Sequence, residues 1–264
     1  MMTTFHSKPP REKKQRTASV KVSAPKDELM RLNKYVAHCG ICSRREAAEL
    51  VKKGLILVNK QVELNPSYIV QSKDKIFYQG NLITPEEKKV YILINKPKNT
   101  VTTSKDEKNR KTVLDMVSNS VKERVYPVGR LDRNTTGLLL LTNDGELSQK
   151  LAHPSFQVKK IYHVVLHKNL SVPDFQKISE GLILEDGKAK VDGISYVDGK
   201  KNEIGIEIHS GKNRIIRRIF ENLNYQVEKL DRVYYAGLTK KNLPRGKYRH
   251  LTSQEVINLK HFLK

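Results

Sequence analysis

Apolar residues recur at helical spacing in two consecutive stretches near the N-terminus: Leu29, Leu32 and Val36, then Ala47, Leu50 and Val51. Ser43 and Glu46 have the spacing of a capping box, so the second helix is predicted to begin directly after Ser43. Gly40 is expected to end the first helix and Gly54 the second. The pattern predicts a pair of helices joined by a short turn.

Short apolar runs of the strand type follow these helices. Residues 55–58 and 61–64 flank Asn59 and Lys60, a pattern that predicts a strand, a turn and a second strand. Further along, strand-like runs occur at residues 90–94, 138–142, 161–166 and 204–209, and helical patterns occur at residues 146–152, 172–180 and 213–222. Strands mixed with helices, without a regular β-α-β repeat, favour an α+β fold with a mixed, largely antiparallel sheet.

Changes in composition divide the chain into four segments. Residues 1–28 hold seven basic and three acidic residues and hardly any apolar residue, which is typical of a disordered basic tail. Such a tail either solubilises the protein or contacts RNA. Residues 29–78 form the small helical module, and residues 79–89, with a glycine, a proline and four charged residues, are predicted to be a linker. Residues 90–264 form a second domain.

The charge of the chain is strongly basic. Its 50 Lys and Arg residues outnumber 28 Asp and Glu residues, which gives a formal net charge of +22. A field of this sign attracts polyanions, so nucleic acid is the partner to expect. No apolar run approaches the roughly 20 residues that span a bilayer, and the N-terminus lacks the apolar region of a secretory signal. We therefore expect a cytoplasmic protein with no membrane partner.

The chain has two cysteines, Cys39 and Cys42, in C-x-x-C spacing. This is the spacing of half a zinc site or of a redox pair, but no second pair of ligands with suitable spacing follows. We expect two ordinary reduced thiols and no metal.

Two arginines mark the small module as a candidate for RNA binding. Arg44 and Arg45 fall in the first turn of the predicted second helix, where the helix dipole disfavours cations unless an anion such as phosphate lies nearby. The alternative is an ordinary solvated charged face. The sequence MRLNKYVAHCGICSRREAAELVKKGLILVNKQV, residues 30–62, resembles an S4 domain, a small RNA-binding module of ribosomal and RNA-modifying proteins. The candidate RNA contacts in this module are Arg31, Lys34, Arg44, Arg45, Lys52 and Lys53.

The segment YPVGRLDRNTTGLLLLTNDG, residues 126–145, contains the strongest candidate for chemistry. Asp132 lies between Arg130 and Arg133, and adjacent cations favour the ionised carboxylate. Such a group is suited to act as a nucleophile or a base and poorly suited to donate a proton. An R-L-D triplet alone is also compatible with a surface ion pair.

The whole segment resembles the signature of the bacterial pseudouridine synthases of the RsuA/RluB group, in which G-R-L-D is followed by variable positions, a hydroxyl residue and G-L-L. Residues 95–97, 153–162 and 211–218 fit the same family, and the similarity covers residues 30–252 in the family's order. The resemblance implies an S4 RNA-binding domain followed by a pseudouridine synthase catalytic domain.

The resemblance also implies roles for individual residues. Asp132 is the expected catalytic nucleophile, Tyr162 is expected to stack on the target uracil, and Arg217 is expected to pair with the Asp132 carboxylate. The remaining candidate RNA contacts are Arg130, Lys212, Asn213 and Arg214. At position 215, where relatives often have Gln, this chain has Ile215, which puts a side-chain hydrogen bond there in doubt.

The implied activity is the isomerisation of a flipped-out uridine to pseudouridine in ribosomal RNA, with 23S RNA favoured over 16S RNA. Nothing is oxidised, reduced or hydrolysed in this reaction, so we expect no cofactor, and we expect a monomer.

A non-catalytic S4-type ribosome assembly factor is the alternative. A glycosidase needs a second carboxylate, and Asp144 is better suited to cap a helix. Four histidines without an evident acid partner are expected to be structural: His38, His153, His163 and His209.

Overall fold

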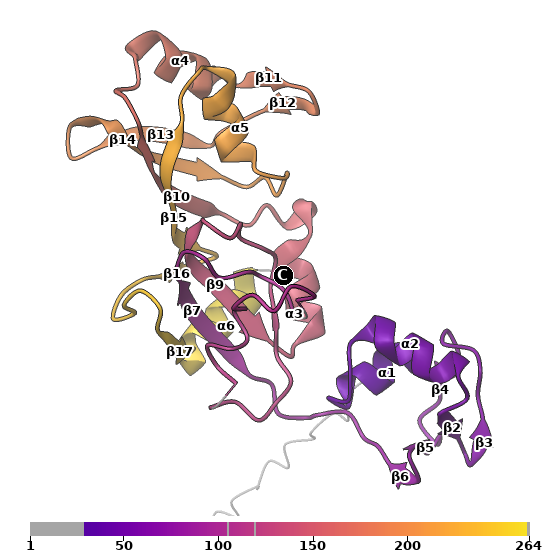
Figure 1. Cartoon of the computed structure of the whole chain (residues 1–264). Coiled ribbons are helices and arrows are strands. Elements are labelled where there is room, and N and C mark those ends of the chain that lie inside the picture. The colour runs from indigo at the N-terminus through magenta and orange to yellow at the C-terminus, as the bar shows by residue number, and fades with distance from the viewer. Residues whose placement is uncertain (1–28, 105, 119, 263–264) are drawn as a thin grey trace, which may run out of the picture.

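The computed structural model describes residues 29–104, 106–118 and 120–262 (Figure 1). The predicted basic tail, residues 1–28, lies outside the described residues. Figure 1 shows a small domain, in indigo, beside a larger one that contains the rest of the described chain. Within these ranges no helix is both long enough and apolar enough to span a bilayer.

The small domain contains the predicted pair of helices and short strands. Its elements are β1 (Met30–Arg31), α1 (Leu32–His38), α2 (Arg44–Lys52), β2 (Ile56–Val58), β3 (Gln61–Val62), β4 (Ile69–Val70), β5 (Ile76–Tyr78) and β6 (Asn81–Leu82). The strands form one sheet in the order β3-β2-β5-β6 and a separate β1–β4 pair. Because β6 pairs with β5, the sheet continues into the stretch that the sequence analysis predicted to be a linker.

Local sequence signals decide where these elements begin and end. The Ser43 side chain accepts a hydrogen bond from the Glu46 amide while the Glu46 carboxylate accepts one from the Ser43 amide, so the predicted capping box is confirmed. Asn59 and Lys60 both have positive φ, as a two-residue hairpin turn requires. Leu32 and Val36 from α1 and Ala47 and Val51 from α2 are fully buried in the core of this domain.

The large domain is built on a nine-stranded sheet. Seven strands follow the order β13 (Gly193–Val197), β14 (Lys200–Ile208), β10 (Lys160–Leu166), β15 (Val227–Tyr235), β9 (Thr136–Thr142), β7 (Tyr91–Lys96) and β17 (Tyr248–His250), with β8 (Tyr126–Pro127) beside β9 and β16 (Leu238–Thr239) beside β15. The β9–β15 pair is parallel and the other pairs of this sheet are antiparallel. The predicted mixed, largely antiparallel α+β fold is confirmed.

The sheet is covered on both faces. Helix α5 (Ile215–Asn222) packs with α4 (Val172–Glu180) on one core, and α3 (Gly145–Ala152) and α6 (Ser253–Phe262) pack on another. Alternate residues of β9 face opposite cores: Leu139 and Leu141 join the first, and Leu138 and Leu140 the second. A strand buried on both sides has no polar face, which explains the continuous apolar run at residues 138–142.

Most predicted elements agree with the observed ones within about two residues, but some elements were not predicted. The strand β15, with the sequence VEKLDRVYY, was missed because charged residues interrupt its apolar alternation. The short hairpin β11 (Leu182–Leu184) and β12 (Gly187–Ala189) and the helix α6 were missed as well. A 3₁₀ turn, η1 (Pro154–Phe156), separates α3 from β10.

The expectation that the histidines lack acid partners is wrong for two of them. His163 Nε2 lies 2.9 Å from Glu203 Oε2, and His209 Nδ1 lies 2.7 Å from Asp192 Oδ2. Both carboxylates come from parts of the sheet that sequence spacing does not relate to the histidines. Neither contact lies in the lining of the pocket described below, and a structural role of these histidines stays a prediction.

Candidate active site

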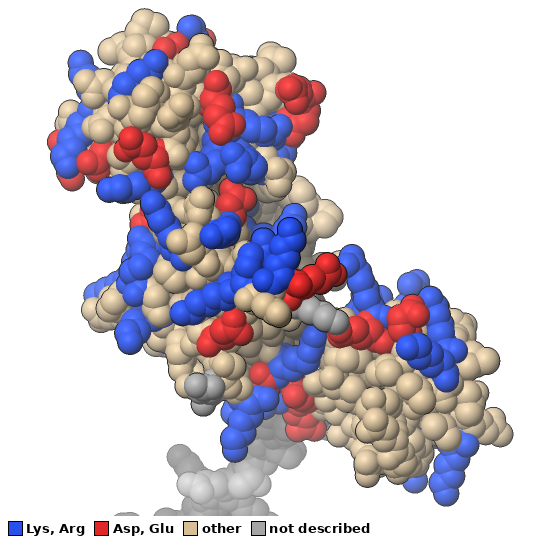
Figure 2. Space-filling view, viewed as in Figure 1, with Lys and Arg blue, Asp and Glu red and all other residues tan. Residues whose placement is uncertain are grey.

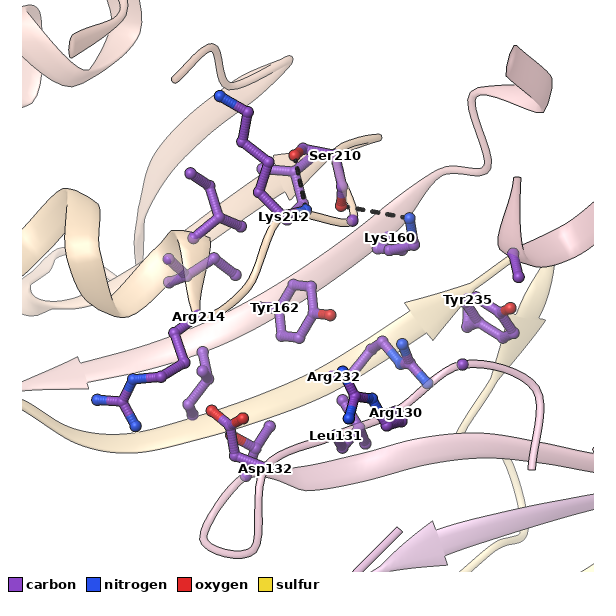
Figure 3. Close-up of a pocket in the computed structure, with 18 of the residues that line it drawn as sticks. Arg130, Leu131, Asp132, Lys160, Tyr162, Ser210, Lys212, Arg214, Arg232 and Tyr235 are labelled. Carbon is purple, nitrogen blue, oxygen red and sulfur yellow. Dashed lines mark hydrogen bonds between the residues drawn. The ribbon is translucent and has the colours of Figure 1, made fainter. Parts of the chain in front are cut away.

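A pocket of about 200 Å³ opens at the middle of the large sheet (Figure 3). The loop before β9 forms one wall with Asp132, and the strands β10 and β15 form another with Tyr162 and Arg232. The loop from β14 to α5 forms the rim. The pocket is smaller than the roughly 300–1,000 Å³ of sites for drug-sized ligands, which suits a single planar base.

Lys96, the last residue of β7, anchors the loop that carries Asp132 through hydrogen bonds. Lys96 is fully buried, and its Nζ donates hydrogen bonds to the carbonyls of Pro97 (3.1 Å), Arg133 (3.1 Å) and Thr135 (2.8 Å). Burial lowers the pKa of Lys96 to about 8, although the Asp132 carboxylate acts in the opposite direction. The lysine therefore ties both ends of the turn that follows Asp132 to the central sheet.

Arg217 lies beside Asp132, as the family resemblance implied. Its Nε is 3.9 Å from Asp132 Oδ2, and its Nη1 donates a hydrogen bond to the Val227 carbonyl at 3.0 Å. The Arg217 side chain is 13% exposed and the Asp132 side chain 38% exposed, so the carboxylate is open to the pocket while its cation is not. Burial lowers the pKa of Arg217, and nearby Arg214 adds to this effect. At this distance the contact is an ion pair and not a hydrogen bond.

Tyr162 occupies the middle of the pocket. It is 8% exposed, and its neighbours across the sheet are Ile206 on β14 and Arg232 on β15. Figure 3 shows its ring between Asp132 on one side and Lys160 and Arg232 on the other. An aromatic ring in this place offers a flat apolar surface to a base that enters the pocket.

Lys160 and Arg232 were not predicted to be site residues, yet both line the pocket. Lys160 precedes Tyr162 by two residues on the same strand, and alternate residues of a strand share a face. This spacing is a signal that could have pointed to Lys160. No local signal points to Arg232, because its place opposite Tyr162 depends on the pairing of β10 with β15.

The predicted RNA contacts at the start of α5 lie at the rim. Lys212, Asn213 and Arg214 are exposed, and Lys212 and Arg214 line the pocket. Lys212 Nζ donates to the Asp186 carbonyl at 2.7 Å, and Arg214 Nη2 lies 3.4 Å from Glu221 Oε1. Ile215 is buried in the core behind them, in keeping with its apolar side chain.

A second cleft, about 650 Å³ in volume, lies between the two domains and meets the active-site pocket at Gly129 and Arg130, which border both. Lys34 and Arg44 line it from the small domain, Arg124 lines it from the large one, and Lys89 lines it from the segment that joins them. Figure 2 shows basic side chains gathered on this face of both domains.

The structure therefore brings some of the predicted RNA contacts together and leaves others apart. Lys34, Arg44 and Arg130 share the cleft. The candidates outside its lining are Arg31, Arg45, Lys52 and Lys53, all of which are exposed. Lys52 is 3.0 Å from Glu49 in an ion pair on the helix surface.

The two cysteines of the C-x-x-C stretch, Cys39 and Cys42, are partly exposed. Both are free thiols. Burial raises the pKa of the Cys39 thiol to about 12, and burial also raises the pKa of the Cys42 thiol. Among the described residues, no group of three or more His, Cys, Asp or Glu side chains has an arrangement that could hold a metal ion.

Comparison with known proteins identifies the two domains. Residues 90–222 match the family described as RNA pseudouridylate synthase, and residues 30–76 match the S4 domain. The chain belongs to the RNA pseudouridylate synthase family. Its assignment to this family, and the prediction that it is an enzyme, are therefore confirmed.

Relatives of this synthase match over most of its length. A protein of Bacillus subtilis called ribosomal large subunit pseudouridine synthase B is 42% identical over 238 residues, which cover 88% of this chain and 96% of the relative. An uncharacterized RNA pseudouridine synthase of Aquifex aeolicus is 33% identical over 87% of this chain and 93% of its own. The crystal structure of a pseudouridylate synthase, 26% identical, superposes with a TM-score of 0.63 over 87% of this chain and 99% of that one.

Proposed function

We propose that this synthase converts a specific uridine of ribosomal RNA to pseudouridine in the cytoplasm, with 23S RNA favoured as substrate, and that it works as a monomer without a cofactor. The name of the Bacillus subtilis relative supports the choice of RNA. The observation that carries the chemistry is the placement of one carboxylate, Asp132, in a base-sized pocket opposite Tyr162 and against Arg217.

The reaction rearranges bonds within one nucleotide. The bond from N1 to C1′ breaks, the uracil turns while it stays bound, C5 joins C1′, and the proton on C5 is exchanged for one on N1. Asp132 is the nucleophile, and its carboxylate attacks C1′ or C6, or acts first as a base on a proton of the sugar. Arg217 is the positioning residue that holds this carboxylate, because it touches Asp132 and does not line the pocket.

The base has to leave its stack before it can enter this pocket, and this step costs a few kcal/mol. Stacking on Tyr162 and contacts between phosphates and basic residues offset that cost. Arg130 lies where the pocket meets the interdomain cleft, so it is placed to fill the gap that the flipped base leaves. The S4 domain holds the same RNA through the cations of the cleft.

The proposal is tested by mapping pseudouridines in ribosomal RNA from cells with and without the gene. A single site that disappears with the gene and returns with the wild-type gene is the expected result. The purified protein should then form pseudouridine in an RNA fragment that contains this site. Loss of no ribosomal RNA site would overturn the choice of substrate.

Asp132→Asn tests the chemistry separately. The amide has nearly the same shape but cannot supply the attacking oxyanion, so RNA affinity should stay within about twofold while turnover falls below detection. Asp115→Asn, at an exposed carboxylate outside the pocket lining, is the matched control and should keep full turnover. Appreciable turnover by the Asp132→Asn variant would show that this residue is not the nucleophile.

A further inference from the structure

Two cations share the wall of the pocket opposite Asp132. Lys160 on β10 and Arg232 on β15 lie on adjacent strands and both face the pocket beside Tyr162 (Figure 3). Neither residue has a part in the mechanism above.

Arg232 is buried, and no carboxylate of the described residues forms an ion pair with it. It is 3% exposed, its Nε donates to the Leu138 carbonyl at 2.7 Å, and its guanidinium carbon lies 4.3 Å from the centre of the Tyr235 ring. Its Nη2 is buried and has no hydrogen-bond partner among the described residues. Buried donors in proteins are almost always paired, and a buried guanidinium without a counterion is costly.

The carboxylate nearest to Arg232 along the chain, that of Asp231, does not pair with it. Asp231 is adjacent in sequence, but consecutive strand residues point to opposite faces. Asp231 is instead engaged by Arg245, Lys240 and Thr136 on its own face. Burial alone would raise the pKa of Asp231, but the hydrogen bonds from Arg245 and Lys240 hold it at about 2.

Lys160 adds a second positive charge to the same wall. Its Nζ donates to the carbonyls of His209 at 2.8 Å and Ser210 at 3.4 Å, which leaves one of three ammonium protons for a ligand. Burial and the nearby charge of Arg232 together lower the pKa of Lys160 to about 8, although Asp192 acts in the opposite direction. The two neighbouring cations therefore repel each other until an anion lies between them.

The two cations of this wall need a negatively charged hydrogen-bond acceptor, and a phosphate provides one whereas a base does not. Uracil is neutral in its ground state, whereas each phosphodiester carries a full negative charge and two oxygens that accept charge-assisted hydrogen bonds. The phosphates on either side of a nucleotide are attached to the sugar whose C1′ reacts, so one of them has to lie close to the base pocket.

We propose that Lys160 and Arg232 form an anion subsite that binds a phosphate of the RNA strand directly next to the target uridine. This inference rests on the proposed function only in that the substrate is an RNA strand with one target uridine. By neutralising this wall, the phosphate draws the flipped nucleotide into the pocket and sets the position of its sugar against Asp132.

The test removes the negative charge of one phosphate from the RNA and the positive charge of Lys160 from the protein, first separately and then together. The probe is a synthetic RNA fragment around a uridine that the wild-type protein has been shown to convert, with one neutral methylphosphonate linkage either 5′ or 3′ of that uridine. A 2′-O-methyl sugar on the 5′ side of the linkage prevents cleavage, and the matched RNA has the same sugar with an ordinary phosphate. Equilibrium affinities are measured for wild type, Lys160→Met, Arg232→Lys and Lys168→Met, an exposed lysine beyond the end of β10.

For the wild type and the Lys168→Met control, one of the two neutral linkages should weaken binding roughly 10- to 100-fold, the usual range for a hydrogen bond to a charged group. In Lys160→Met the same linkage should cost no more than about twofold, because the partner charge is already gone. Arg232→Lys, which keeps the charge but loses the guanidinium fork, should fall between these values. Thermal unfolding of each variant identifies any that fails to fold.

Equal losses in wild type and Lys160→Met at both linkages would overturn the proposal, and would mean that Lys160 only anchors the loop at His209. A variant that reacts slowly but retains the full effect of the linkage would also overturn it, since the cations would then act on the base. Because the RNA is chosen as one that the enzyme converts, neither outcome bears on whether the proposed function is correct.

Discussion

At the scale of single residues, the site depends on side chains whose atoms serve different purposes. In Tyr162 the ring and the hydroxyl can be separated by substitution. In the proposed mechanism the ring supplies stacking area and the hydroxyl takes the C5 proton. Figure 3 shows the hydroxyl on the side of the ring that faces Arg232.

We predict that Tyr162→Phe binds RNA as the wild type does but reacts about 10² to 10⁴ times more slowly, the usual contribution of a general base. Tyr162→Leu should be impaired in both respects, because stacking on a base is worth about 1–3 kcal/mol. Single-turnover rates and RNA affinities of the three proteins, measured side by side, separate the role of the ring from that of the hydroxyl. A fully active Leu variant would reduce Tyr162 to a core residue.

A second prediction at this scale concerns Arg217. Arg217→Ala removes the cation beside Asp132 and the hydrogen bond to Val227, so the single-turnover rate should fall roughly 10²-fold as the carboxylate moves. The free energy of unfolding should fall by about 1 kcal/mol because a hydrogen bond is lost. Arg217→Lys should recover part of the rate, since it retains the charge.

Rate and affinity together separate positioning from a structural role for Arg217. Because Arg217 touches Asp132 and does not line the pocket, Arg217→Ala should slow the single-turnover reaction while RNA affinity stays within about twofold of wild type. In Arg218→Ala, whose guanidinium pairs with Asp186 on the outside of α5, both quantities should stay near their wild-type values. A single-turnover rate in Arg217→Ala equal to that of Arg218→Ala would show that the contact with Asp132 has no role in catalysis.

At the scale of elements, the end of β7 supports the catalytic loop through one buried lysine. Lys96 has a pKa of about 8 in the folded protein, against its ordinary value of 10.5. Between these values the unfolded chain binds more protons than the folded one, so this group makes stability rise with pH. The slope approaches about 1.4 kcal/mol per pH unit when one proton is involved.

We predict that Lys96→Met destabilises the fold, because three carbonyls lose their donor, and that it slows the reaction by loosening the Asp132 loop. The loss of stability relative to wild type should be greater at pH 10 than at pH 7.5. Urea unfolding at several pH values measures this difference, with Lys98→Met at an exposed lysine as the control. A loss that does not change with pH would contradict the low proton affinity of Lys96.

At the scale of the whole molecule, the two domains meet at a cleft that carries positive charge from both sides. Arg44 reaches it from the first turn of α2, whereas Arg45, its neighbour, is exposed outside the cleft lining. A helix N-terminus with adjacent arginines suits a phosphate. In the proposed function the S4 domain supplies affinity for the RNA, and the large domain supplies the chemistry.

Replacing Arg44 and Arg45 by Ala should weaken RNA binding and flatten its dependence on salt. Each lost phosphate contact lowers the slope of log K against log salt by about 0.7–0.9. The single-turnover rate at saturating enzyme should stay within about twofold of wild type, because the active site is untouched. Lys73→Ala, at an exposed lysine outside the cleft, serves as the control. An unchanged slope in the double variant would mean that both arginines face only solvent.

The features that the sequence alone determined are those whose physical cause lies within a few residues. The capping box of Ser43 and Glu46, the turn at Asn59 and Lys60, and the cap of α3 by Asp144 were all predicted and are all observed. Helix α4 has the predicted bounds, Val172–Glu180. Hydrogen bonds between neighbouring residues and the conformational preferences of single residues act locally, so the features that they cause can be predicted from the sequence.

Only the tertiary structure decided which distant side chains meet. The resemblance to a family named Arg217 as the partner of Asp132, but the sequence contains no spacing that places the two side chains 3.9 Å apart. Lys96 reaches the Asp132 loop because β7 pairs with β9, and Arg232 reaches the pocket because β15 lies between β10 and β9. Contacts of this kind follow from the order and register of strands, which depend on the packing of the whole sheet and not on any short stretch of residues.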